Sequence, residues 1–374
     1  MQRRLHPRLR VPQRLFLVAA LLLLASPGLL TLAAPSRSVS ALEGRRLAAW
    51  PAPPLDGASL RAWPGAVEAW LQDHLGGRDA VLGLMARLRF LLREPGETSV
   101  VFGTAGALFL ATSARLALAA GHPVLNAPQR HAMTRVLEAW TAAAAAAALP
   151  LLALLVPDKE TLLSTHLPWW GRRFDSEPPL DAFLAELVAA GRVAVLDLRP
   201  ALRAAPPDRA TYLLEDTHWT GYGAYLGYRA LMQRLAADWP ALRTLAGDAV
   251  AWRPTTGHQE LRRLLGLSAT ANAAIVEEPV PATPRARHLS PPGEVELFRS
   301  ERADTPGPRL LFIGDSYRYA LLIWLAESFP ALTATGLTSA SGLAELLRRH
   351  PSDLVVIELV ERNLYIDPVH RLAR

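Results

Sequence analysis

Short apolar runs alternate along much of the chain with longer segments whose apolar positions recur every three or four residues. The apolar runs predict strands at 149–156, 192–198, 309–313, 331–336 and 353–360. The periodic segments predict helices at 180–190, 221–237, 317–328 and 341–349. Strands that are buried on both faces consist of nearly continuous apolar residues. Because strand and helix alternate, we expect an α/β fold with a mostly parallel sheet and helices on both faces.

Three further elements precede this region. The pattern predicts a helix over 64–93, a hairpin over 99–110 that turns at residues 104–106, and a helix over 127–148. Residues 240–305 interrupt the alternation and are rich in Pro, Arg and Thr, so we expect an irregular insertion there. These boundaries predict one domain over residues 64–374.

The N-terminus combines a basic tail, residues 1–14, with an uncharged apolar run, residues 15–34. About 20 apolar residues suffice to span a bilayer, and arginines before the run place that end in the cytoplasm. A cleavable signal peptide has the same layout, and Thr31-Leu32-Ala33 resembles its cleavage site. The length of the run favours an uncleaved anchor. Residues 35–63, rich in Pro and Ala, then form a linker to an exported domain.

Composition excludes several classes of function. At 374 residues and 51% hydrophobic residues the chain can bury a sizeable core, and its net charge of +6 owes much to the five arginines before residue 15. The rest of the chain carries no basic stripe with interleaved aromatic residues, which argues against nucleic-acid binding. The sequence has no cysteine, and its ten histidines show no metal-ligand spacing. We therefore expect neither a metal nor a cofactor.

Gly314-Asp315-Ser316 stands where a predicted strand passes into a predicted helix. In open α/β sheets this boundary, at the carboxyl end of a strand, is where ligands and reacting groups collect. Ser316 is either a nucleophile or an ordinary helix N-cap.

Asp216 and His218 lie in a predicted loop just before another helix. A serine hydroxyl needs a histidine to accept its proton and an acid to orient that histidine. We therefore predict Ser316 as the nucleophile, His218 as the general base and Asp216 as the residue that orients His218. The backbone N–H of Ser316, at the start of a helix, is a candidate oxyanion-hole donor.

The motifs together resemble the alginate O-acetyltransferase family of exported, SGNH-hydrolase-like proteins. The resemblance rests on D-T-H-W-T-G-Y-G-A from Asp216, F-I-G-D-S-Y from Phe312 and E-R-N-L from Glu361, with D-H-L-G-G-R from Asp73 and V-P-D-K from Val156. It extends from residue 43 to residue 366. The D-x-H motif precedes G-D-S, an order inverted relative to ordinary SGNH esterases.

The resemblance implies a function as well as a fold. Asp216, His218 and Ser316 match the family's catalytic triad, which transfers acetyl groups to exopolysaccharide hydroxyls, as in alginate, through an acetyl-serine. It also implies a location in the periplasm, attachment to the cytoplasmic membrane through residues 15–34, and a membrane-bound O-acyltransferase that supplies the acetyl group. Two alternatives stay open: a carbohydrate acetylesterase with the same triad, and a non-catalytic anchored scaffold of a polysaccharide export complex.

Two departures from the family pattern concern the subfamily and the acceptor more than the chemistry. Glu43-Gly44-Arg45 stands where the family has E-N-R, and Gly103–Ala107 replaces a hairpin turn that usually carries Lys, Asp and Trp.

Lys159, Tyr317 and Arg362 are further candidates for the site or its loops. Lys159 is the only lysine among 40 basic residues, and it follows a predicted core strand. A compact ammonium group has uses that the planar guanidinium of arginine does not, although an accident of composition explains a lone lysine equally well. Glu361 and Arg362 follow the last predicted strand, and we expect an ion pair there in preference to a role in lining the site.

Overall fold

The computed structural model describes residues 11–33, 37–40, 46–93, 100–111, 116, 126–172, 179–267, 275–289 and 297–364. The arginines of residues 1–10 and the departure at 43–45 lie outside the described residues. Contacts divide the chain into two compact units. The first comprises Met1–Thr98 with Arg262–Ala269, and the second comprises Ser99–Leu261 with Thr270–Arg374.

In the described residues before Thr98, the first unit contains the helices α1 (Val11–Ala33), α2 (Gly57–His74) and α3 (Arg78–Leu92). The helix predicted over 64–93 is therefore wrong in two respects. It begins earlier, at Gly57, where the side chain of Asp56 accepts hydrogen bonds from the first turn. It also breaks before Arg78, because Gly77 adopts a left-handed conformation with φ of 81°.

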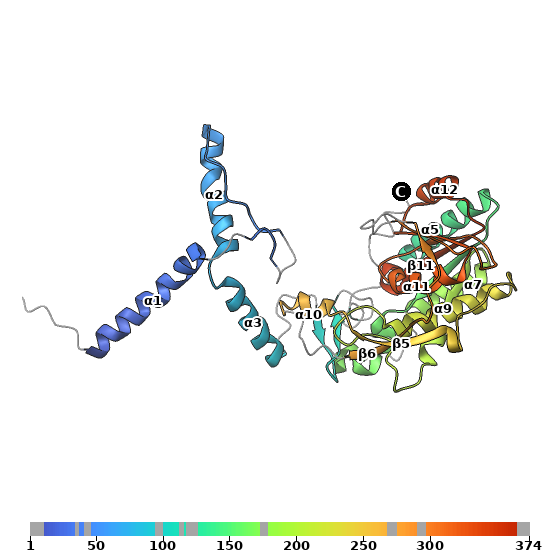
Figure 1. Cartoon of the computed structure of the whole chain (residues 1–374), viewed down its shortest axis with the longest axis horizontal. Helices are drawn as coiled ribbons and strands as arrows, with labels where there is room; N and C mark the ends of the chain where they lie inside the picture. Colours follow the sequence, from blue (N-terminus) through green and yellow to red (C-terminus); the bar gives the residue numbers. More distant parts are fainter. Residues whose placement is uncertain are drawn as a thin grey trace, which may run out of the picture. The chain divides into compact units, whose positions relative to one another are not determined.

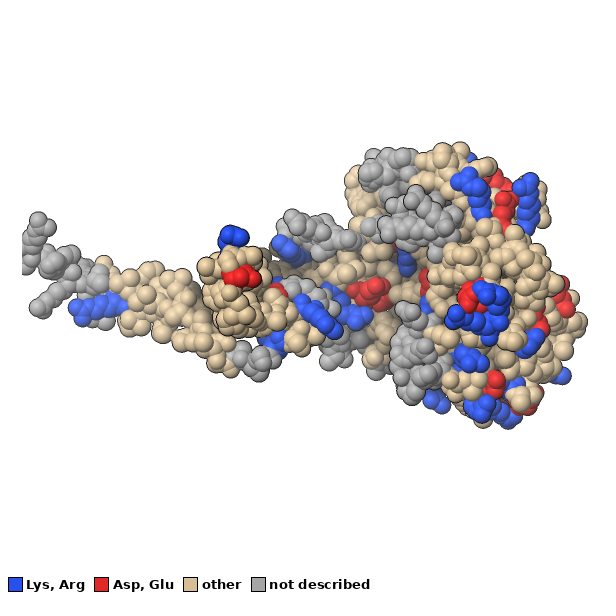
Figure 2. Space-filling model, turned by 90° about the horizontal axis from the view of Figure 1, so that it is seen from above, with Lys and Arg blue, Asp and Glu red and all other residues tan. Residues whose placement is uncertain are grey.

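Helix α1 is long and apolar enough to cross a membrane over Gln13–Ala33, and none of that segment is buried. Figure 2 shows basic atoms near the start of this helix and an uncharged surface along the rest of it.

The second unit is built on a seven-stranded sheet, with the strand order β4-β3-β11-β9-β10-β8-β7. The five strands from β4 to β10 are parallel, whereas β8 and β7 are antiparallel to their neighbours. The predicted parallel α/β fold is confirmed. The bounds of these strands are β3 (Leu151–Val156), β4 (Ala194–Asp197), β7 (Arg287–His288), β8 (Leu297–Glu301), β9 (Leu310–Ile313), β10 (Ala331–Thr335) and β11 (Leu354–Val360).

Helices cover both faces of the sheet (Figure 1). Alternate residues of β3 show the division, since Leu152 and Leu154 belong to one core cluster and Ala153 and Leu155 to the other. The first cluster includes α9 (Gly221–Ala236) and α11 (Arg318–Ser328). The second includes α5 (Ala127–Ala146), α7 (Pro179–Ala190) and α12 (Ala340–Arg349).

The segment 240–305 is more regular than its composition predicts. Strands β5 (Val250–Thr256) and β6 (Ile275–Pro281) form an antiparallel ribbon, and β7 and β8 extend the main sheet. The prolines do not prevent strand formation here. A two-stranded ribbon consists only of edge strands, where a missing N–H donor is tolerated.

The remaining elements are short. They are the hairpin β1 (Val100–Phe102) and β2 (Leu108–Leu110), helices α6 (Lys159–Leu162), α8 (Arg199–Arg203) and α10 (Glu260–Leu264), and single 3₁₀ turns at Ser164–His166, Trp169–Arg172, Gly247–Ala249 and Glu361–Leu364. The hairpin confirms the prediction, with Ala105 and Gly106 of its turn at positive φ.

We expect the contact between α9 and α11 to dominate the stability of one face of the sheet. Trp324 is fully buried, and the centroids of its ring and the Tyr225 ring are 4.7 Å apart. Trp324→Ala should lower the free energy of unfolding by about 3–5 kcal/mol through lost burial and a cavity. The matched control is Ile323→Ala, because Ile323 is 44% exposed on the same helix. Denaturant unfolding of both variants measures the difference, and equal losses would contradict this packing.

Candidate active site

Ser316 lies between the end of β9 and the start of α11, and it is exposed. Its hydroxyl does not cap the helix. Instead, the side chain of Asp315 accepts the N–H of Tyr317 at 2.9 Å. The Ser316 Oγ is 2.8 Å from Nε2 of His218. Of the two interpretations of this serine, the N-cap does not fit the geometry, and the hydroxyl faces the imidazole of His218 instead.

His218 and Asp216 reach the same place from the loop before α9. Asp216 Oδ1 is 2.7 Å from His218 Nδ1 and also accepts the backbone N–H of His218 at 2.9 Å. Its other oxygen accepts the backbone N–H of Glu260 at 2.7 Å. The structure thus joins Asp216, His218 and Ser316 in one continuous chain of hydrogen bonds, although 98 residues separate His218 from Ser316.

The electrostatics of Asp216 suit an acid that stays ionised. The carboxyl group is almost fully buried, and burial alone raises its pKa. Hydrogen bonds from His218 and from the N–H of Glu260 outweigh this effect and lower the pKa of Asp216 to about 2. Its negative charge therefore persists at neutral pH and can stabilise an imidazolium on His218.

Lys159 contacts three backbone oxygens around the loop that carries the histidine. Its Nζ donates to the carbonyls of Leu108 and Leu214 at 2.7 Å each, and to that of Asp216 at 3.0 Å. The side chain is 1% exposed, and burial lowers the pKa of its ammonium group to about 8. Lys159 thus joins the β1–β2 hairpin, the end of β3 and the loop of Asp216.

Arg362 and Tyr317 also brace that loop. Arg362 Nη1 donates to Asp158 at 2.8 Å, and its Nη2 donates to the hydroxyl of Tyr317 at 3.3 Å. The Tyr317 hydroxyl donates to the carbonyl of Thr217, and the Tyr317 ring lies 4.9 Å from that of His218, between centroids. Tyr317 is fully buried, so it supports His218 from within the protein.

The ion pair expected between Glu361 and Arg362 has a different arrangement. Arg362 pairs with Asp158, whereas Glu361 accepts hydrogen bonds from the backbone N–H of Asp158 and the hydroxyl of Thr161. Both residues thereby fix the turn after β3 to the turn after β11.

A carboxyl pair beneath Ser316, formed by the partly buried Asp315 and the buried Glu358, goes beyond what the motifs predict. Asp315 accepts the N–H of Val360 at 2.9 Å and the amide of Asn363 at 2.6 Å, and its own N–H donates to Glu358 at 3.1 Å. Burial raises the pKa of Glu358 well above its usual range. A Cβ at position 314 would lie 2.4 Å from Glu358 Oε2, so the loop needs Gly314. The signal for this pair in the sequence is Glu358, the one acidic residue within the apolar run LVVIELV.

Among the described residues, Asp216, His218 and Glu260 bring ligand atoms of the kind that bind metals within 4.8 Å of one another. Most of these atoms already take part in hydrogen bonds. His218 Nδ1 contacts Asp216, and Glu260 accepts the hydroxyl of Thr217 at 2.8 Å. A metal bound here would take the place of the hydrogen bond that orients His218.

Residues 100–324, more than half of the chain, match the family described as SGNH hydrolase-like domain, acetyltransferase AlgX. The comparison with curated proteins gave no match.

Similar solved structures include PatB1 from Bacillus cereus, 13% identical, which aligns over 74% of this chain and 99% of its own with a TM-score of 0.54. This similarity supports the α/β fold. The O-acetyltransferase domain of Pseudomonas putida AlgJ is 16% identical over 74% of this chain and 99% of its own, with a TM-score of 0.48. AlgX from Pseudomonas aeruginosa is 16% identical over 74% of this chain and 67% of its own, with a TM-score of 0.46.

Lys159→Arg tests whether this fully buried position requires a lysine in place of an arginine. The larger guanidinium of Lys159→Arg does not fit a fully buried position, so we expect a loss of about 1–3 kcal/mol in the free energy of unfolding. Arg203→Lys, at an exposed position, is the control and should change little. Denaturant unfolding measures both variants. A Lys159→Arg protein as stable as the wild type would show that the three carbonyl contacts do not require a lysine.

Proposed function

From the premise that the chain belongs to the AlgX family of SGNH hydrolase-like acetyltransferases, we propose that it transfers acetyl groups to hydroxyls of an exported polysaccharide. Ser316 is the nucleophile, His218 the general base and Asp216 the residue that orients His218. One observation carries this proposal: His218 is 2.8 Å from Ser316 Oγ through one ring nitrogen and 2.7 Å from Asp216 through the other.

In the first half-reaction, His218 Nε2 accepts the hydroxyl proton of Ser316 while Oγ attacks the carbonyl carbon of the acetyl donor. The negative charge that develops on the carbonyl oxygen requires hydrogen-bond donors, and the Ser316 N–H is the candidate donor. Collapse of the tetrahedral intermediate breaks the bond to the leaving group, which takes the proton from His218. Ser316 then carries the acetyl group as an ester.

In the second half-reaction, a sugar hydroxyl takes the place of the departed leaving group. His218 accepts its proton, its oxygen attacks the acetyl-serine, and Ser316 recovers the proton as the new ester leaves. Water in the same position would give acetate and make the protein an esterase. Occupancy of the acceptor position by sugar therefore decides between transfer and hydrolysis.

The proposed location follows from α1. This helix spans the cytoplasmic membrane as an anchor, so the catalytic unit works in the periplasm. A membrane-bound O-acyltransferase supplies the acetyl group from across the membrane, and the acceptor is an alginate-like exopolysaccharide. The apolar, unburied surface of Gln13–Ala33 supports the anchor.

Acetyl transfer from a small activated ester to an oligosaccharide measures the proposed activity directly. Ser316→Ala should reduce the rate of transfer by at least about 10³-fold, because the nucleophile is lost. The matched control is Ser341→Ala, which removes an exposed serine hydroxyl near the start of α12. Circular dichroism should show the same fold in both variants.

The product separates the remaining alternatives. Acetylated oligosaccharide supports the transferase, whereas acetate formed at a rate independent of the oligosaccharide would identify an esterase. A Ser316→Ala protein with wild-type activity would contradict the proposed triad.

A further inference from the structure

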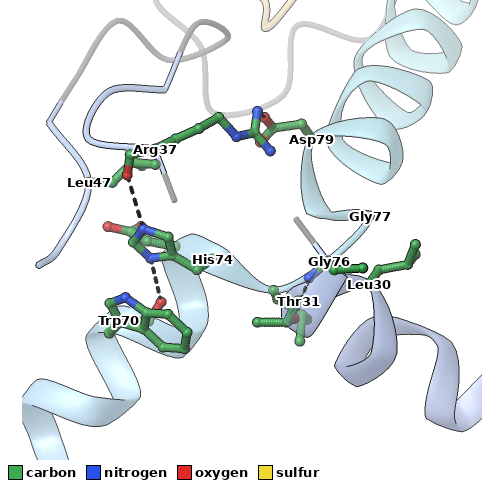
Figure 3. Close-up of a pocket in the computed structure, with 12 residues that line it drawn as sticks. Leu30, Thr31, Arg37, Leu47, Trp70, His74, Gly76, Gly77 and Asp79 are labelled. Atoms are coloured by element: carbon green, nitrogen blue, oxygen red, sulfur yellow. Dashed lines mark hydrogen bonds and ion pairs between the residues drawn. The ribbon is translucent and has the colours of Figure 1, made fainter. Parts of the chain in front are cut away.

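The turn between α2 and α3 lies against the last part of α1 (Figure 3). The backbone N–H of Gly76 donates to the hydroxyl of Thr31 at 2.8 Å. A Cβ at position 76 would lie 2.2 Å from the Cβ of Leu30, so only glycine allows this approach. The contact lies within one turn of the end of α1 at Ala33. The start of α3 is therefore held beside the end of the apolar helix.

Side chains of the segment Asp73–Arg78 fix this arrangement from the other side. Asp73 accepts the N–H of Ala48 at 2.7 Å, and His74 Nε2 is 3.1 Å from the carbonyl oxygen of Arg37. The side chain of Arg37 in turn pairs with Asp79, in the first turn of α3, at 2.9 Å. The chain leaving α1 thus returns to hold α2 and α3 at this junction. The motif D-H-L-G-G-R, which the catalytic site does not use, provides most of these contacts.

One face of α3 is packed and the opposite face is not. On the packed face, the guanidinium of Arg262 lies 5.1 Å from the ring centroid of Phe90, and Ala86 is buried. The opposite face carries an apolar stripe at spacings of three and four residues, the spacing of neighbours on one helix face. The stripe consists of six side chains that are each between 44% and 76% exposed: Val81, Leu84, Met85, Leu88, Leu91 and Leu92.

Charge borders the stripe. On a helical projection, Arg87 lies on one side of the stripe and Arg89 on the other, and both residues are exposed. The only acid in α3, Asp79, is already paired with Arg37. An apolar face bordered by arginines is typical of a helix that lies in the plane of a membrane surface, where arginines extend to the phosphates.

We propose that α3 lies in the outer interface of the membrane that α1 spans, with its apolar stripe in the boundary between headgroups and acyl chains. Arg87 and Arg89 bind the phosphates of anionic lipids. This inference rests on the proposed anchor but not on the proposed chemistry. The bilayer is the partner that covers the stripe, because the contact between Gly76 and Thr31 holds the start of α3 where α1 leaves the membrane.

The absence of cysteine in the chain makes site-specific labelling direct. The full chain carrying Leu88→Cys, labelled with the fluorophore NBD, is reconstituted in vesicles of phosphatidylethanolamine and phosphatidylglycerol. Glu68→Cys, at an exposed polar position on α2, is the control, and Leu22→Cys in α1 reports insertion. Each label is exposed in turn to a lipid-attached quencher and to aqueous iodide.

We expect the lipid quencher to remove most of the emission of the labels at Leu88 and Leu22, and iodide to remove most of the emission at Glu68. Equal quenching patterns at Leu88 and Glu68 would overturn the proposal. An apolar environment at Leu88 that no lipid quencher reaches would also overturn it, because the stripe would then contact protein. Lack of lipid quenching at Leu22 would refute the anchor itself. Acetyl transfer, measured separately on each labelled protein, distinguishes these outcomes from a failure of the proposed activity.

Discussion

The site depends on a single buried charge, the carboxylate of Asp216. A carboxylate withdrawn from water is tolerated only when hydrogen-bond donors replace the lost hydration. The backbone N–H groups of His218 and Glu260 and the imidazole of His218 supply them. Because these donors come from two separate segments, satisfying the charge also fixes the loop that carries His218. The backbone carbonyl of Asp216 is held in turn by Lys159.

The same principle extends beneath Ser316. Three ionisable groups lie close to the ends of β9 and β11, where apolar residues would stabilise the core more: Glu358, which is buried, and Asp315 and Arg362, which are partly buried. Their hydrogen bonds hold three turns together, those after β3, β9 and β11. Parallel strands bring these turns to one edge of the sheet, and the ionisable groups fix their positions relative to one another. We interpret them as residues that lower the stability of the fold but fix the positions of these turns, as is common at functional sites.

The sequence predicts those features that depend on neighbouring residues in the chain, namely the strands and the catalytic motifs. The apolar runs predicted the parallel strands, because burial on both faces leaves a continuous pattern, and the two motifs predicted which residues meet. The break before α3 does not follow from the pattern, because the apolar periodicity continues across Gly77 and a glycine residue alone does not show that its φ is positive. The partners of Lys159 and Arg362 could not be predicted. Lys159 bonds to backbone carbonyls, which leave no trace in residue identity, and Arg362 pairs with Asp158, 204 residues away.

The central claim is that Ser316 carries the acetyl group between donor and acceptor. Its most direct test is to mix the protein with an activated acetyl ester in the absence of acceptor, quench the reaction with acid and map the modification by peptide mass spectrometry. The account predicts one acetyl group on the peptide that contains Ser316, and its loss when an oligosaccharide is added before the quench. An acetyl group on another residue, or transfer to the sugar without acetylation of Ser316 at any time, would contradict it.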